Sequence, residues 1–240
     1  MSKVKAKIIS IGHLPADIDL TKIASWKSGL FELSDVIEHY ELRCDSDTDD
    51  WEYSDANICT QLPERGIEDL LVALVNVPLE NNYYLRRVQN NMLVITFYEI
   101  ADSLRQNRIP LENVVLRSLY ACSLVHRRNS GHIPEMWELS KFTHDETRGC
   151  IYDMTGVKEE IAFSCVKPII CSECYERSVR EKVSRTTLDE ARSELTKINK
   201  QLFYQITDLV KAHPIIAIIV SSIWAILLSC IGSLLGNLLF

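Results

Sequence analysis

The sequence is short of positive charge. Its 240 residues contain 26 lysines and arginines against 33 aspartates and glutamates, so the formal net charge is −7 at pH 7. A protein whose main task is to bind nucleic acid needs a basic face that neutralises phosphates. We therefore expect no nucleic-acid partner.

Short motifs that identify common enzymes are also missing. The chain contains no glycine-rich phosphate loop, no G-x-S-x-G nucleophile elbow and no complete H-E-x-x-H zinc-binding motif. Peptide hydrolysis by zinc needs three fixed protein ligands, an open position for water and a carboxylate as base. The chain offers the carboxylates without the ligand cage, since no ligand spacing links His13, His39, His126 and His132.

A secretion signal and a disulfide framework are two further features that we do not find. The N-terminal residues, MSKVKAKIIS, include no apolar signal-peptide core, and the eight cysteines are scattered along the chain. Disulfides are rare in reducing compartments. We therefore expect a cytosolic domain with free thiols at Cys44, Cys59, Cys122, Cys150, Cys165, Cys171, Cys174 and Cys230.

Hydrophobic patterning predicts strands that alternate with helices. Continuous apolar runs at residues 70–77 and 92–98 indicate buried central strands, and residues 80–91 between them indicate an excursion or an edge hairpin. Strands alternating with helices predict an α/β or α+β fold. The remaining expected elements are strands at 7–11 and 31–43, helices at 20–26 and 110–126, and a solvated acidic loop at 44–55.

The residues best suited to chemistry lie between His144 and Cys174. Cys171 and Cys174 form a C-x-x-C pair, which lets two thiolates on a tight turn reach one zinc ion, and Cys150 is placed to supply a third ligand. The fourth ligand is either His144 or Cys165, each six residues before one of these cysteines. Two other interpretations are a redox-active C-x-x-C pair and ordinary buried thiols.

These residues resemble a known family. His144, the pair Gly149 and Cys150, Met154, and the run from Cys171 to Cys174 are similar to the C-terminal part of archaemetzincin-like zinc metalloproteases. In that family an H-E-x-x-H-x-x-G-x-x-H motif leads into a cysteine knuckle that holds a second, structural zinc. The resemblance implies a metzincin-like mixed-sheet domain with a zinc knuckle, and it favours His144 as the fourth knuckle ligand.

The catalytic motif of that family is incomplete here. With His144 placed on the third histidine, Pro134 and Glu138 stand where the first two histidines should be, and Glu135 falls on the general base. Lys141 then replaces the glycine, and Asp145 falls on the first knuckle cysteine. The resemblance thus implies a degenerate enzyme, in which Glu135 would be the catalytic base only if activity remains.

A periodic stripe of apolar residues follows the cysteines. Its members recur every three or four residues, which predicts an amphipathic helical stalk over residues 181–212 that self-associates as a coiled coil. A lone helix packed on the domain would give a similar stripe. The stripe consists of Leu188, Ala191, Leu195, Ile198, Leu202, Ile206 and Leu209.

The C-terminal segment carries no charged side chain from His213 to Phe240. Residues 214–240 are long enough to cross a bilayer core of about 30 Å, which predicts one transmembrane helix that acts as a tail anchor. Basic residues upstream place the preceding domain, residues 1–180, in the cytoplasm. Gly232 and Gly236 form a G-x-x-x-G motif that permits close pairing of such helices, so we expect a homo-oligomer.

Three functions are compatible with these patterns. The leading one is a non-catalytic, zinc-stabilised, tail-anchored module, a relative of metallopeptidases without their activity, that binds a protein partner as yet unidentified. The second is a membrane-disrupting effector of a bacterial antiviral defence system, whose tail helices oligomerise. The third is an active zinc metallopeptidase with an atypical site.

Overall fold

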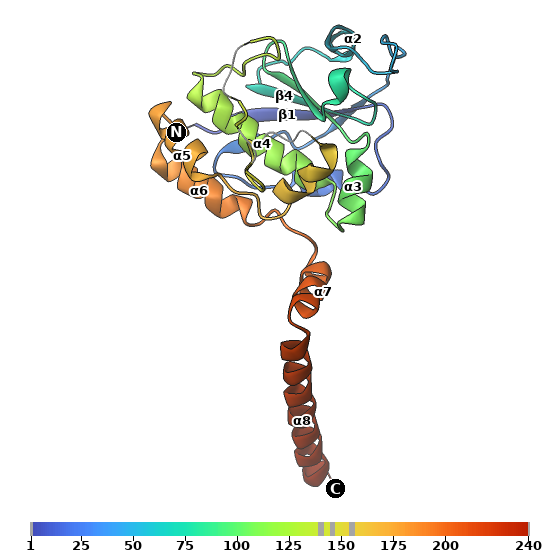
Figure 1. Ribbon diagram of the computed structural model, residues 1–240, viewed down its shortest axis with the longest axis vertical. Coiled ribbons are helices and arrows are strands. Elements are labelled where there is room, and N and C mark those ends of the chain that lie inside the picture. The colour runs from blue at the N-terminus through green and yellow to red at the C-terminus, as the bar shows by residue number, and fades with distance from the viewer. Residues whose placement is uncertain (1, 139–141, 145–146, 154–156, 240) are drawn as a thin grey trace. The chain divides into compact units, whose positions relative to one another are not determined.

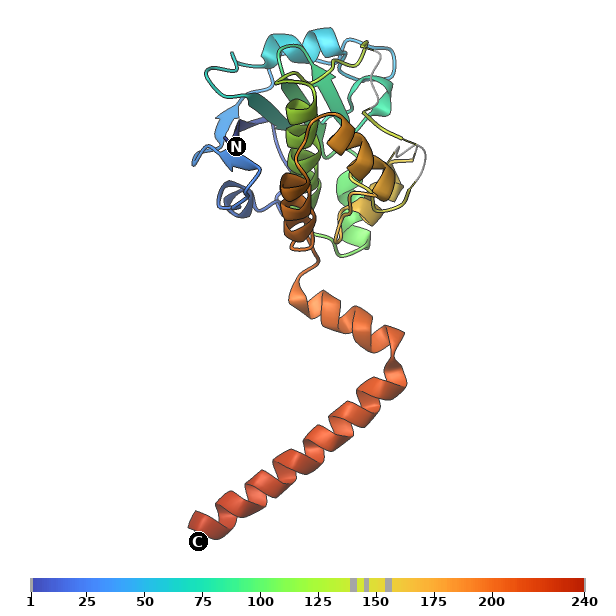
Figure 2. The same ribbon diagram turned by 90° about the vertical axis from the view of Figure 1, so that its left-hand side faces the viewer.

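The computed structural model describes residues 2–138, 142–144, 147–153 and 157–239. The chain divides into two units, Met1–Asn199 and Lys200–Phe240. Figures 1 and 2 show the first unit as a sheet with helices on it and the second as two helices.

The first unit is built on a six-stranded sheet, which confirms the expected α/β class. The strand order is β2-β1-β4-β6-β5, and β3 also pairs with β1. All pairings are parallel except that of β5 with β6, so the sheet is mixed. The strands are β1 (Val4–Ile11), β2 (Phe31–Leu33), β3 (Glu38–Tyr40), β4 (Leu70–Val75), β5 (Leu85–Val88) and β6 (Met92–Thr96).

The apolar runs produce this sheet because their side chains alternate between two buried faces. On β4, Val72 packs in one hydrophobic cluster and its neighbour Ala73 in another on the opposite face. All residues of β4 and β6 are buried, as predicted for central strands covered on both sides. Helices α3 (Ile100–Gln106) and α4 (Glu112–Arg128) cover one face, and Ile58 of α2 (Asp55–Gln61) packs on the other.

The segment between the two central strands forms an edge hairpin, one of the two predicted forms. Asn90 and Asn91 both have positive φ, at 57° and 59°, in the turn that joins β5 to β6. Two consecutive residues of this kind build the tight turn that suits antiparallel strands, and asparagine tolerates the left-handed region well. The outer edge of β5 is not bare, because the amide of Met136 donates to the carbonyl oxygen of Arg87 at 3.2 Å.

Helix α4 is the central helix of the first unit. Nearly all of its residues are buried, and it lies across the face of the sheet (Figure 1). Arg117, on this helix, is 1% exposed and donates to the hydroxyl of Tyr84 at 2.8 Å and to the carbonyl oxygen of Ile151 at 2.6 Å. A buried guanidinium needs such partners. Arg117 thereby ties the region before β5 to the cysteine-rich segment.

The first half of the predicted stalk belongs to the folded domain. Helices α5 (Ser172–Arg180) and α6 (Arg185–Leu195) pack on the first unit, and Leu188, Ala191, Leu195 and Ile198 are all within its main hydrophobic cluster. The unit accordingly ends at Asn199 rather than near residue 180. The stripe had two interpretations because a helix that packs on a domain needs the same three-to-four spacing as a coiled coil.

A buried carboxylate fixes α6 in place. Glu194 accepts hydrogen bonds from the Ser28 hydroxyl at 2.6 Å, from the Gly29 amide at 2.8 Å and from the Tyr120 hydroxyl at 2.8 Å. These donors come from the loop before β2 and from α4. The carboxylate therefore joins three segments that are far apart in the sequence.

The second unit contains α7 (Leu202–Ala212) and α8 (Pro214–Leu239). Helix α8 is long and apolar enough to cross a membrane, with a mean hydropathy of 2.5 over Pro214–Gly232 and none of that window buried. Helix α7 ends at Ala212, and the backbone of its C-cap residue, His213, leaves the helical region at φ −134° and ψ 62°. The last three members of the apolar stripe, Leu202, Ile206 and Leu209, lie on α7 and are exposed.

Candidate metal centre

Two loops and one helix bring the candidate ligands together. Cys171 is the N-cap residue of α5, and Cys174 lies in the first turn of that helix. Cys150 forms an isolated β-bridge with Ile169, and His144 forms another with Asp153. These four candidate ligands, which are up to 30 positions apart in the sequence, thus meet at the N-terminus of α5.

The bridge beside Cys150 has two hydrogen bonds. The Ile151 amide donates to the Ile169 carbonyl at 2.9 Å, and the Ile169 amide donates to the Gly149 carbonyl at 2.8 Å. Gly149 has φ +89°, a conformation that residues with a Cβ rarely adopt, so glycine is required where the chain turns into Cys150. These contacts hold Cys150 next to the strand-like segment that leads to Cys171.

The four ligand atoms lie close to the separations of a tetrahedral zinc site. The Nε2 atom of His144 lies 3.2 Å from Cys150 Sγ and 3.6 Å from Cys171 Sγ, and Cys150 Sγ lies 4.0 Å from Cys174 Sγ. All ligand atoms of the group are within 4.8 Å of one another. Zinc bonds of about 2.3 Å to sulfur and 2.0 Å to nitrogen would separate neighbouring ligand atoms by about 3.5–3.8 Å. Three sulfurs and one nitrogen at these distances fit Zn²⁺.

Electrostatics favour a thiolate at this centre. The hydrogen bond with Cys174, together with backbone amides and His144, lowers the pKa of Cys150 to about 4. The same contact with Cys150 raises the pKa of Cys174, because that thiol keeps the proton of the pair. A metal ion would displace this proton, since zinc binds cysteine as the thiolate.

Arginines and an aromatic ring surround the centre. The Nη2 atom of Arg177 lies 3.3 Å from Cys174 Sγ, and the guanidinium of Arg177 also lies over the Tyr152 ring, 5.9 Å from its centroid. Arg128 contacts the same ring at 5.3 Å. Three thiolates outnumber the two charges of a zinc ion, so a loaded centre would be anionic. Nearby guanidinium groups offset that charge.

The alternative fourth ligand, Cys165, does not join the group. Its side chain is fully buried, and burial raises the pKa of its thiol to about 12. The group of gathered ligand atoms consists of His144, Cys150, Cys171 and Cys174. Between the two candidates for the fourth position, the geometry therefore favours His144.

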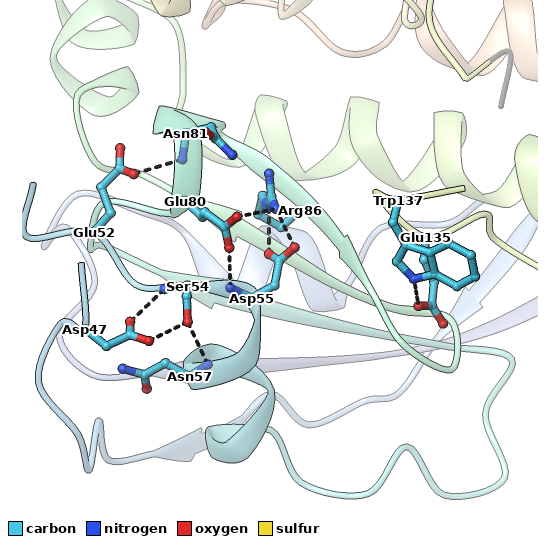
Figure 3. Close-up of polar contacts among 10 residues, drawn as sticks. All are labelled: Asp47, Glu52, Ser54, Asp55, Asn57, Glu80, Asn81, Arg86, Glu135 and Trp137. Atoms are coloured by element: carbon cyan, nitrogen blue, oxygen red, sulfur yellow. Dashed lines mark hydrogen bonds and ion pairs between the residues drawn. The ribbon is translucent and has the colours of Figure 1, made fainter. Parts of the chain in front are cut away.

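The segment that the family resemblance placed on the catalytic motif is not helical over its described residues. Two ligands of an H-E-x-x-H motif share one face of a helix, whereas residues 132–135 are without regular structure and 136–138 form a turn. Glu135 accepts a hydrogen bond from the Trp137 indole at 2.7 Å (Figure 3), and Glu138 contacts His132 at 3.1 Å. Lys141, Asp145 and Met154, the other residues of that comparison, lie outside the described residues.

A hollow of about 240 Å³ lies beside Glu135. Its lining includes Asp55, whose carboxylate is bound by the guanidinium of Arg86 on β5 (Figure 3). The carboxylate of Glu80 also lies 3.8 Å from that guanidinium. Asp55 and Glu80 are therefore partnered by the guanidinium of Arg86, and Glu135 is partnered by the Trp137 indole. Among the described residues, Glu135 does not belong to the group of side chains that could hold a metal.

A second spacing of potential ligands begins on α4 and ends in the loop after it. Cys122, His126 and His132 have the intervals of the three histidines in the family motif, with cysteine in the first position. In the structure Cys122 is fully buried inside the domain, His126 is partly buried and His132 is exposed. Among the described residues their ligand atoms do not form a group that could hold a metal.

Comparisons with known proteins give one structural match. The crystal structure of archaemetzincin from Methanopyrus kandleri is similar to this chain with a TM-score of 0.45 and 15% sequence identity, and the match covers 75% of this chain and 95% of that chain. No protein-family model matches the sequence. No curated protein matches it either.

Proposed function

We propose that this protein is a zinc-stabilised interaction module that is tethered to a membrane by its C-terminal helix and does not act as a peptidase. The observation that carries the proposal is the group of one histidine and three cysteines at the start of α5. The apolar helix α8 supplies the tether.

The composition of the metal centre supports a structural role. A catalytic zinc keeps one position open for water, whereas four protein ligands of the Cys₃His type close the coordination shell. The ligands come from the loop that follows α4 and from α5, so a bound zinc would fasten α5 to the rest of the first unit. Binding energy of this kind contributes directly to folding.

The region around Glu135 supports the absence of peptidase activity. Glu135 lies in a non-helical segment and is engaged with Trp137, and the described side chains that could hold a metal gather at one place only. A peptidase base must stand beside a metal-bound water. In the proposed function, the first unit serves instead as a binding surface for a partner protein.

The membrane tether rests on α8 and on the charges before it. Twenty-six residues at 1.5 Å each give about 39 Å, which exceeds the hydrocarbon core of about 30 Å. Lys197, Lys200 and Lys211 precede the helix, which favours a cytoplasmic position for the first unit. Pairing through Gly232 and Gly236 would bring copies of the module together.

The test combines a metal count with fractionation of cells that express the full chain. We expect one zinc per chain, recovery of the protein in the membrane fraction, and release to the soluble fraction when residues 200–240 are removed. Glu135→Gln should leave zinc content and folding unchanged. Two zinc ions per chain, with peptide hydrolysis abolished by Glu135→Gln, would instead establish the peptidase.

Dye uptake by the same cells distinguishes an interaction module from a membrane-disrupting effector. An effector would make them permeable to a small dye only when the apolar helix is present. We expect no difference in dye uptake between cells with the full chain and cells with residues 1–199.

A further inference from the structure

Helix α7 has an apolar face that nothing in the described part of the second unit covers. Leu202, Phe203, Ile206, Leu209 and Val210 are each between 46% and 71% exposed. At 100° per residue these five side chains occupy an arc of about 120° on one side of the helix. We call this set the apolar face of α7.

The opposite side of α7 is polar. It carries Tyr204, Thr207, Asp208 and Lys211, and Asp208 forms an ion pair with Lys200 at 2.7 Å. A short helix with one apolar face and one charged face is typical of segments that lie in the plane of a membrane surface. The amphipathic ring of Tyr204 favours the same headgroup region.

Pro214 separates this helix from the membrane-spanning one. Proline disfavours the helical conformation in the residue before it, and His213 indeed leaves that region. Helix α7 is therefore not an extension of α8 and is free to follow another direction. A single residue lies between them, so the C-terminal end of α7 must sit at the membrane surface wherever α8 crosses.

A second copy of the chain is a weaker occupant for the apolar face. Coiled-coil pairing requires a heptad pattern over three to four heptads, whereas α7 has 11 residues. The preceding members of the stripe, from Leu188 to Ile198, are already buried inside the first unit. What is left of the stripe is too short to form a stable coiled coil by itself.

We propose that α7 lies flat on the membrane with its apolar face among the lipid acyl chains near the headgroups and Lys211 toward the aqueous side. This proposal rests on the membrane tether proposed above. It assigns α7 a lipid surface as its partner, and it makes the tail a two-part anchor of one spanning and one surface helix.

The experiment uses the full chain in nanodiscs of phosphatidylcholine and phosphatidylglycerol. A spin-labelled keto amino acid is introduced at one position at a time in α7, which leaves the native cysteines untouched, and at Ile219 in α8 as a reference. The measured quantity is the ratio of collision rates with oxygen, which enters lipid, and with a water-soluble nickel complex.

We expect a severalfold higher ratio at positions 206, 209 and 210 than at 207, 208 and 211, with the period of a helix. Ile206→Asp combined with Leu209→Asp should lower the ratio at 210 to the aqueous value and leave that at 219 unchanged. Thr207→Asp on the polar side is the matched control and should change neither ratio.

Two results would overturn the proposal while the tether stands. One is an aqueous ratio at every α7 position with a lipid ratio at 219. The other is spin–spin broadening at 206 and 209 that disappears on dilution with unlabelled protein, because a second copy would then cover the face. An aqueous ratio at 219 itself would overturn the tether and the surface helix together.

Discussion

The guanidinium of Arg177 lies 3.3 Å from the Sγ atom of Cys174, one turn before it on α5. A donor to a ligating sulfur stabilises the thiolate and orients it, and loss of such an outer contact typically reduces metal affinity 10- to 100-fold. Arg177→Met should weaken zinc binding by about that factor without abolishing it. Competition with a chromophoric chelator measures the affinity.

Arg180→Met is the matched control, because Arg180 lies on the same helix and is exposed. It should leave the zinc affinity at the wild-type value. Equal affinities for the two variants would mean that the contact between Arg177 and Cys174 has no influence on the metal.

The four ligands should behave as a unit. Cys171→Ser and His144→Ala should each lower the zinc content of the purified protein to well below one per chain and destabilise the region around α5, since metal binding energy is folding energy here. Elemental analysis and thermal unfolding under reducing conditions provide the two measurements. Wild-type protein without zinc would exclude the centre altogether.

Cys165→Ser separates the two candidates for the fourth ligand. Cys165 is buried outside the group, so this variant should keep its zinc, although it loses some stability because a hydroxyl replaces a buried thiol. Loss of zinc in Cys165→Ser with retention in His144→Ala would reverse the assignment.

Alkylation should divide six of the eight cysteines into three classes. Burial raises the pKa of Cys122 and Cys165 to about 12, so at pH 7 both stay protonated, and the protonated thiol is a poor nucleophile. We expect iodoacetamide to modify exposed Cys44 in all samples, Cys150, Cys171 and Cys174 only after zinc is removed, and neither Cys122 nor Cys165 in the folded protein. Mass spectrometry of peptides reads out each site.

Truncation tests where the domain ends. Residues 1–199 retain α6 and should give a soluble monomer with a single cooperative unfolding transition. Residues 1–184 lack Leu188, Ala191 and Leu195, which are completely buried, and should fail to fold, because each large apolar side chain removed from a core costs about 2–5 kcal/mol. Light scattering and circular dichroism distinguish the two. A folded 1–184 fragment would show that α6 is dispensable.

The sequence predicted the central strands and the gathering of the candidate metal ligands for definable reasons. Long apolar runs such as 70–77 have few alternatives to a buried strand, and a C-x-x-C pair has few uses in a reducing environment. The fourth ligand could not be derived, because the spacing of His144 and of Cys165 is equally acceptable until the bridge between Cys150 and Ile169 places the loops.

Other features were ambiguous for physical reasons. The stripe from Leu188 to Leu209 is continuous in period, yet the structure divides it after Ile198, and periodicity alone does not say which surface a helix packs on. Helix α2 begins at Asp55, the last residue of the predicted acidic loop, where the Ser54 hydroxyl accepts from the Asn57 amide (Figure 3). Serine is a preferred N-cap residue, so Ser54 could have predicted from the sequence where this helix begins.

The carboxylate of Glu194 also has a bearing on the timing of folding. Its partner Ser28 is 166 residues earlier in the chain, and Tyr120 is 74 residues earlier. Contacts of such long range must overcome a large loop-closure entropy, and domains rich in them fold slowly. During synthesis the residues of the sheet are made first, but the hydrogen bonds of Ser28, Gly29 and Tyr120 to Glu194 form only once α6 is available. The chain would therefore carry an unfinished domain and an apolar tail at the same time, which is the condition in which a nascent protein depends most on chaperones.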